Sequence, residues 1–298
     1  MKEMYEGIVQ STTEGLEQSI IQIKRDINRT YPTHPLFKSD SERFNTLEKL
    51  LITYWKYDRC IGYVQGMNFI MGCLMYHWVE PDITFWLFVS IIEQYQLWDN
   101  YKGDLKGIRK HWGVIKLLIE EELPELAEHF VKNEMRVEMF ATDWILGLFS
   151  SIIPIQQMGM FLDNFFKNKW DFFYKIVLVF LRDIQKELLQ EEEMWDVLVT
   201  LKSLATPLRS EHSPAPSHRS FKTSIFSRFK KESEYSTDKR FHSPVKGKGF
   251  GFMDSIRDIF KEKQYTWDWM NILKKATTYK IKNPAIVCQY IIKYELTH

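Results

Sequence analysis

Ile23-Lys24-Arg25-Asp26-Ile27-Asn28-Arg29-Thr30 is the stretch from which the fold can be worked out. Together with Leu16 and Ile20 before it, its isoleucines recur at helical spacing and predict an amphipathic helix. We expect this helix to stop near Arg29, because Pro32 lacks the N–H group needed to continue it. Arg29 would then lie at a helix end beside a loop, with Asp26 one turn earlier on the same face.

A second stretch, Tyr63-Val64-Gln65-Gly66-Met67-Asn68, forms a glycine-containing turn between two apolar helical patterns. A turn can present a side-chain amide clear of its own backbone, so Gln65 is expected to reach outward. The following run from Met67 to Trp78 is apolar on nearly every side, which predicts a buried helix. Such a helix would anchor Gln65 firmly.

Helical patterns continue along the chain, whereas the alternating pattern of strands is nearly absent. We therefore predict an all-α fold with roughly ten or more helices.

Two further expectations concern single side chains. We expect Met67 to fill the core, and we expect His77 to be a buried, hydrogen-bonded core residue.

Composition narrows the function classes. The 298 residues include 40 Lys and Arg against 39 Asp and Glu, a balance that gives no argument for nucleic-acid binding and fits a protein partner better. The three cysteines, Cys60, Cys73 and Cys288, are scattered and odd in number, which argues against disulfides and against a zinc site. No apolar run approaches the length of about 20 residues that a membrane-spanning helix needs. We expect a cytoplasmic protein, and a peripheral location on endomembranes stays open.

An arginine and a glutamine on rigid supports suit chemistry on a phosphate. Arginine offers a permanently charged fork of donors, and a glutamine amide can both donate to and accept from a water. At these residues the chain resembles the TBC domain, the catalytic module of Rab GTPase-activating proteins. The first family signature, Ile-x-x-Asp-x-x-Arg-Thr, is matched by Ile23, Asp26, Arg29 and Thr30. The second, Tyr-x-Gln-Gly-Met-Asn, is matched by Tyr63, Gln65, Gly66, Met67 and Asn68.

The resemblance implies two catalytic residues. Arg29 would be an arginine finger, and Gln65 a glutamine finger that replaces the glutamine of the GTPase itself. The residues expected to support them are Asp26, Thr30, Tyr63, Gly66, Met67 and Asn68. The partner would be a GTP-bound Rab-type GTPase in vesicle trafficking and intracellular protein transport. No phosphate-binding loop is present, so the GTP and Mg²⁺ would belong to the partner, and we expect neither a cofactor nor a metal site in this chain.

Three segments are expected. Residues 1–205 would form the main helical part of the TBC domain, and residues 251–298 its closing helices. Between them, residues 206–250 are rich in Ser and Pro and carry ten Lys or Arg against four Asp or Glu. This composition predicts a disordered, solvated insertion. The alternative is a transient contact with anionic membrane through its basic residues.

Two other functions stay open from the residues alone. A non-catalytic Rab-binding scaffold would use the same surface without accelerating hydrolysis. A helical adaptor would have no GTPase partner, but it leaves the paired signatures without a reason.

Overall fold

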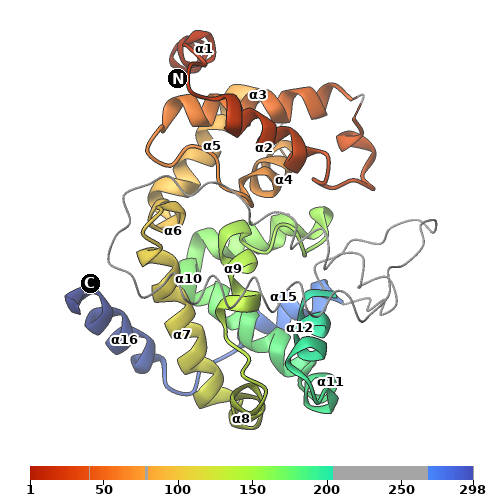
Figure 1. Ribbon diagram of the computed structural model, residues 1–298, viewed down its shortest axis with the longest axis vertical. Helices are drawn as coiled ribbons and strands as arrows, with labels where there is room; N and C mark the ends of the chain where they lie inside the picture. The colour runs from red at the N-terminus through yellow and green to blue at the C-terminus, as the bar shows by residue number, and fades with distance from the viewer. Residues whose placement is uncertain (40, 78–79, 204–267, 298) are drawn as a thin grey trace.

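The computed structural model describes residues 1–39, 41–77, 80–203 and 268–297, and within them every regular element is helical (Figure 1). The prediction of an all-α fold with ten or more helices is confirmed. There are fourteen described α-helices and two short 3₁₀ helices: α1 Lys2–Gln10, α2 Glu17–Ile27, η1 Pro35–Phe37, α3 Glu42–Tyr57, α4 Met67–His77, α5 Pro81–Gln94, α6 Leu97–Tyr101, α7 Lys106–Glu122, α8 Pro124–Lys132, α9 Glu138–Gly147, η2 Ile155–Gln157, α10 Met158–Asp183, α11 Gln185–Gln190, α12 Met194–Ser203, α15 Trp269–Thr278 and α16 Pro284–Thr297.

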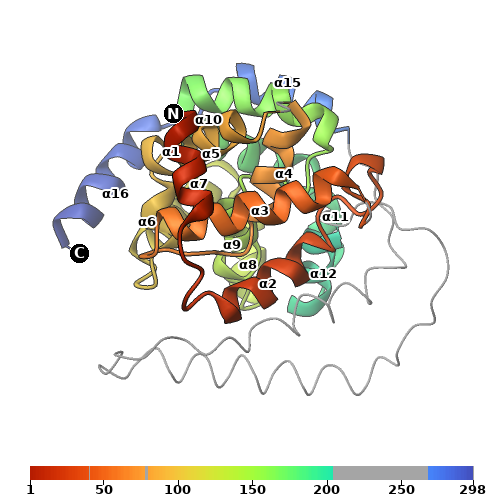
Figure 2. The same cartoon turned by 90° about the horizontal axis from the view of Figure 1, so that it is seen from above.

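Helices α1 to α5 gather at one end of the molecule (Figures 1 and 2). Helix α2 is amphipathic as predicted, and Ile23 and Ile27 face the core while its other side meets solvent. Helix α3 packs on both α2 and α4. The first helix, α1, packs on α3 and α5 without burying any residue completely, and the sequence analysis did not predict it.

Helix α4 connects the two parts of the fold. Residues Met67 to Met75 are all buried, which confirms the prediction of a helix covered on most sides. It contacts α2, α3 and α5 on one side and α9 on the other. His77, the last residue of α4, is exposed. The expectation of a core histidine was therefore wrong, because the buried part of α4 ends at Met75, two residues before the helix does.

The second part of the fold is built around α7, α9 and α10. Its core is aromatic: Phe149 lies between Trp144 and Phe173, with ring centroids 5.4 and 4.9 Å away. Helix α10 is kinked at Lys169, where φ is 53° and ψ is −138°. Because that backbone conformation is costly for a residue with a Cβ, the kink depends on the packing around it.

The last two described helices pack onto this second part. Trp269 of α15 is buried and stacks on Phe180 of α10 with ring centroids 5.3 Å apart. Helix α16 lies along α7 (Figure 1). The predicted division at residues 205 and 251 remains a prediction, and the insertion expected at 206–250 lies outside the described residues.

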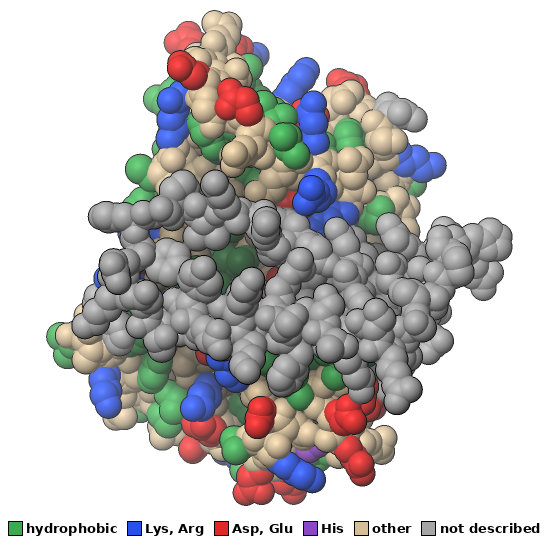
Figure 3. Space-filling model, in the orientation of Figure 1, with side chains coloured by type: hydrophobic (Ala, Val, Ile, Leu, Met, Phe, Trp, Pro, Cys, Tyr) green, Lys and Arg blue, Asp and Glu red, His purple; other side chains and the backbone are tan. Residues whose placement is uncertain are grey.

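Charged side chains of both signs are interspersed over the described parts of the face in Figure 3, as the near-neutral composition suggests. None of the described helices combines the length and the apolar character required to cross a lipid bilayer.

Candidate functional site

Arg29 lies just beyond the C-terminal end of α2, which confirms the expected position of the helix end. The helix ends at Ile27 with Asn28 as its cap. The Thr30 hydroxyl then donates to the carbonyl oxygen of Asp26 at 2.8 Å. This bond satisfies a carbonyl of the last turn and holds the chain as it leaves the helix.

Asp26 holds Arg29 through one carboxylate oxygen. The guanidinium Nε donates to Asp26 Oδ1 at 3.0 Å, and Nη2 lies 2.8 Å from the same oxygen. The Asp26 side chain is 0% exposed and that of Arg29 is 11% exposed. Burial raises the pKa of the Asp26 carboxyl above its usual range, while the positive charge of Arg29 acts in the opposite direction. Charge-assisted pairing of this kind fixes the direction of the guanidinium.

The second carboxylate oxygen of Asp26 reaches the other signature. The Tyr63 hydroxyl donates to Asp26 Oδ2 at 2.8 Å. Burial, together with the charge of Asp26, raises the pKa of that hydroxyl well above its usual value, so Tyr63 keeps its proton for this bond. One carboxylate therefore joins the segment of Arg29 to the segment of Gln65.

Gly66 shapes the turn that carries Gln65. Its φ is +109°, which a residue with a side chain rarely adopts. A Cβ placed on Gly66 would lie 3.0 Å from the carbonyl oxygen of Leu146, at the end of α9. Only glycine fits both conditions. Gln65 directly precedes this turn and is partly exposed.

Asn68 ties the turn back to α2. Its Oδ1 accepts from the Gly66 N–H at 3.1 Å, and its Nδ2 donates to Thr30 Oγ1 at 2.8 Å and to the Asp26 carbonyl at 3.4 Å. Asn68 is completely buried, so these bonds are protected from water. Met67 is also completely buried, as predicted. Its sulfur lies 3.3 Å from the Val64 nitrogen, across the turn.

The structure thus places the predicted residues in one network. Asp26, Thr30, Tyr63 and Asn68 are joined directly by hydrogen bonds, and Arg29 and Gln65 lie on the two segments that this network connects. Among the described residues there is no cluster of metal-binding side chains.

Sequence reasoning missed one contact region. The last two residues of α9 and the turn that follows them, Leu146 to Ser150, are called here the 146–150 turn and contact the segments of both signatures. The Tyr31 hydroxyl donates to the Ser150 carbonyl at 2.8 Å and lies 3.0 Å from the Phe69 carbonyl. Tyr31 follows the first signature immediately, but no sequence pattern indicates that its hydroxyl binds a carbonyl 119 residues away.

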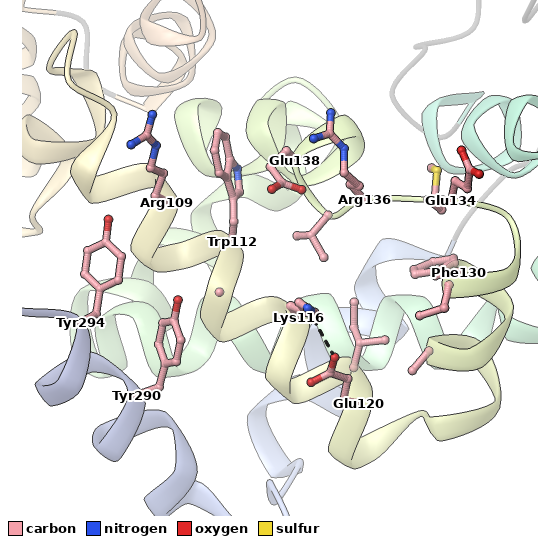
Figure 4. Close-up of a pocket in the computed structure, with 16 residues that line it drawn as sticks. Arg109, Trp112, Lys116, Glu120, Phe130, Glu134, Arg136, Glu138, Tyr290 and Tyr294 are labelled. Atoms are coloured by element: carbon pink, nitrogen blue, oxygen red, sulfur yellow. Dashed lines mark ion pairs between the residues drawn. The ribbon is translucent and has the colours of Figure 1, made fainter. Parts of the chain in front are cut away.

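A cavity of about 770 Å³ lies elsewhere, between α7, α8 and α16 (Figure 4). Its lining includes Trp112, Phe130 and Tyr290, and its ion pair joins Lys116 to Glu120 at 3.8 Å. No residue of either signature lines it. Its walls are mostly apolar and offer no arrangement of acid, base and nucleophile, so the signatures remain the better candidate site.

Comparison with known sequences gives a consistent family. The sequence profile of the Rab-GTPase-TBC domain matches residues 2–189, which is more than half of the chain. The Rab GTPase-activating protein eat-17 of Caenorhabditis elegans is 30% identical over 168 residues, covering 56% of this chain and 19% of that protein. The human ecotropic viral integration site 5 protein homolog is 32% identical over 169 residues, covering 56% of this chain and 21% of that protein. The match thus spans about a fifth of these relatives.

Solved structures show the same fold. The Chlamydomonas flagellar RabGAP TBC domain superposes with a TM-score of 0.60 at 25% identity, covering 69% of this chain and 68% of that one. The Ypt/Rab-GAP domain of Gyp1p superposes with a TM-score of 0.54 at 20% identity, covering 78% of this chain and 80% of that one.

Proposed function

Because the chain belongs to the Rab-GTPase-TBC domain family, we propose that it accelerates GTP hydrolysis by a Rab-type GTPase and supplies Arg29 and Gln65 in trans. Members of this family bind Rab GTPases and activate them without binding nucleotide themselves. One observation carries the assignment of residues. The buried Asp26 carboxylate binds Arg29 with one oxygen and Tyr63 with the other, so it joins the two signatures.

The chemistry follows from the two side chains. A small GTPase alone hydrolyses GTP slowly, because the charge that builds on the phosphoryl oxygens is poorly neutralised. An arginine supplied in trans accelerates hydrolysis by about 10³ to 10⁵. Arg29 would place its guanidinium against those oxygens, and the Gln65 amide would orient the attacking water. The partner holds GTP and Mg²⁺.

The segments that carry Arg29 and Gln65 are held in place before a GTPase docks. Arg29 is already held by a buried carboxylate, and Gln65 precedes a turn fixed by Gly66 and Asn68. Little motion would then be needed when the GTPase docks, and preorganised charges cost little reorganisation in the transition state.

The test is single-turnover GTP hydrolysis over a panel of purified, GTP-loaded Rab-type GTPases. For a GTPase that responds, Arg29→Ala and Gln65→Ala should each abolish most of the acceleration while binding is largely retained. Arg136→Ala is the matched control, because Arg136 is exposed beside the cavity of Figure 4, away from both signatures. Full stimulation by both finger variants would contradict the assignment.

One observation favours the alternative of a non-catalytic Rab-binding scaffold. The Arg29 side chain is only 11% exposed, and a finger must reach the nucleotide. The same assay decides between the two. A scaffold would bind GTP-loaded Rab-type GTPases with no change in the hydrolysis rate for any of them.

The proposal also extends to cellular setting. A Rab-directed activator would work in vesicle trafficking on the cytoplasmic side of membranes. The three cysteines are free thiols, which fits a reducing compartment. Fractionation of cells expressing the chain would test this location, and recovery from the secreted fraction would contradict it.

A further inference from the structure

The 146–150 turn has an unusual backbone. Helix α9 ends at Gly147, and the next two residues, Leu148 and Phe149, have φ values of 47° and 57°. Two consecutive side-chain-bearing residues in the left-handed region are costly, so the surrounding packing must hold them. Phe149 is completely buried among aromatic rings, and Leu148 is buried beside it. The turn is therefore set by the core.

The segment of Arg29 rests on this turn through Tyr31. Tyr31 is buried, and its hydroxyl donates to the Ser150 carbonyl at 2.8 Å. Its own φ is 45°, again unfavourable for an aromatic residue. Its ring also lies against Gly72 of α4, where an added Cβ would come within 3.1 Å of it. Tyr31 is thus fixed at both its ring and its hydroxyl, two residues after Arg29.

The segment of Gln65 rests on the same turn through Gly66. Backbone atoms of Leu146 and Gly147 lie 3.0 to 3.2 Å from the position of a Gly66 Cβ. The Leu146 carbonyl is itself held, because the Tyr101 hydroxyl donates to it at 2.8 Å. Gln65 is the residue directly before this contact.

We infer that the 146–150 turn sets the spacing between the two fingers, and that Tyr31 is a positioning residue acting through its hydroxyl. This inference rests on the proposed function. The Asp26 network ties the two segments to each other, while the turn ties both to the rigid second part of the fold. Two segments that are joined only to each other could still move together relative to a docked GTPase.

Loss of the Tyr31 hydroxyl should therefore affect the chemical step more than docking. In Tyr31→Phe the ring and its packing remain, but the hydroxyl's bond to the Ser150 carbonyl and its contact with the Phe69 carbonyl are both lost. Because a misplacement of about 1 Å can cost about 10²-fold in rate, we expect kcat to fall about 10-fold, with KM for the GTP-loaded GTPase within about twofold. A merely structural role would lower the melting temperature without this split.

Tyr174→Phe is the matched control. Tyr174 is also buried, and its hydroxyl lies 2.7 Å from His111 Nδ1, a contact that touches neither finger segment. It should lower the melting temperature comparably and leave kcat unchanged below that temperature.

A second comparison uses Gly147, where an added Cβ would lie 4.0 Å from the Gly66 Cα in ordinary contact. Gly147→Ala should keep kcat, whereas the larger Gly147→Val should press on Gly66 and lower it.

The outcomes separate the inference from the proposed function. The inference is supported if kcat falls in Tyr31→Phe and Gly147→Val but not in Tyr174→Phe or Gly147→Ala. It also requires that Tyr31→Phe cause no further fall when it is added to Arg29→Ala. Wild-type kcat in folded Tyr31→Phe, with Arg29→Ala inactive, overturns the inference alone. If Tyr31→Phe does not fold, wild-type kcat in Gly147→Val overturns it. Full activity of both Arg29→Ala and Gln65→Ala overturns the proposed function and the inference with it.

Discussion

Asp26 and Glu122 are two buried carboxylates with similar partners and different settings. Each accepts hydrogen bonds from an arginine and a tyrosine: Asp26 from Arg29 and Tyr63, and Glu122 from Arg182 at 3.4 Å and Tyr279 at 2.9 Å. Glu122 also accepts from the backbone N–H of Lys282. Both carboxylates are almost completely shielded from solvent, at 0% and 1% exposure.

The difference lies in what each carboxylate holds in place. Asp26 binds an arginine three residues away that is 11% exposed, and its network leads to Gln65. Glu122 binds an arginine 60 residues away that is 43% exposed, and its other partners come from the segment between α15 and α16. A buried Arg–carboxylate–Tyr set is thus no sign of catalysis by itself. Under the proposed function the first set supports the catalytic residues, whereas the second joins α7 and α10 to the segment between α15 and α16.

The largest expected effect comes from neutralising each carboxylate in turn. Asp26→Asn breaks a buried ion pair, which should cost about 3–5 kcal/mol of unfolding free energy, and should lower stimulated kcat by about 10²-fold. Glu122→Gln should cost about 1.5–3 kcal/mol and leave kcat unchanged in folded protein. Urea unfolding and single-turnover hydrolysis measure the two quantities. An equal loss of kcat in both variants would erase the distinction.

The two tyrosines allow a milder version of the same comparison. Tyr63→Phe and Tyr279→Phe each remove one hydroxyl that donates to a buried carboxylate, at a cost of about 1.5–3 kcal/mol each. Only Tyr63→Phe should also lower kcat, by about 10-fold, because only its partner Asp26 holds a residue that we propose as a finger. Unchanged kcat in Tyr63→Phe would remove Tyr63 from the support of the site.

His111 sharpens the comparison, since it is buried beside the like charge of Lys110. Burial, and to a lesser degree the charge of Lys110, lowers its pKa well below the usual 6.5. The unfolded chain takes up a proton below about pH 6.5 and the folded chain does not. The contribution of His111 to the unfolding free energy should therefore be complete above that pH. Below it, the unfolding free energy should fall by up to about 1.4 kcal/mol per pH unit.

His111→Gln is the variant to compare, because its amide can still pair with the Tyr174 hydroxyl. Urea unfolding at about pH 7.5 and about pH 5.5 should show a shallower fall for the variant than for the wild type. Equal slopes would mean that another group causes the pH dependence.

The smallest effect is expected for an exposed pair. Lys275 of α15 lies 2.8 Å from Asp183 of α10, with side chains 46% and 27% exposed. Lys275→Ala should change the unfolding free energy by less than about 1 kcal/mol, because water and salt screen such pairs. A loss comparable to that of Glu122→Gln would show that exposure is a poor guide to these energies.

The sequence predicted the helices that carry the two signatures well, because these helices depend on local patterns. The apolar run after Met67 could only be a buried helix, and it is. The isoleucine spacing placed Asp26 on the buried side of α2, and Pro32 indicated that the helix ends nearby, although it ends already at Ile27. Within these local rules the amino-acid types decide the structure almost alone.

What the sequence did not predict depends on distant partners. Leu148 and Phe149 are ordinary helix-compatible residues by type, and only the aromatic core around them accounts for their left-handed backbone. Tyr31 reaches Ser150 across 119 residues, which no spacing rule can anticipate. The exposure of His77 at the end of α4 was missed for a related reason. An apolar pattern predicts a buried helix, but it does not show how far along the helix the neighbouring elements cover it.

The packing of α15 and of Glu122's partners has a consequence for chain continuity. Trp269 stacks on Phe180, and Glu122 receives Tyr279 and Lys282, so side chains bind the last described segment to the rest. Pieces comprising residues 1–203 and 268–297 accordingly carry complementary surfaces. Produced as two polypeptides, they should reassemble, with the short piece contributing the missing wall of the aromatic core.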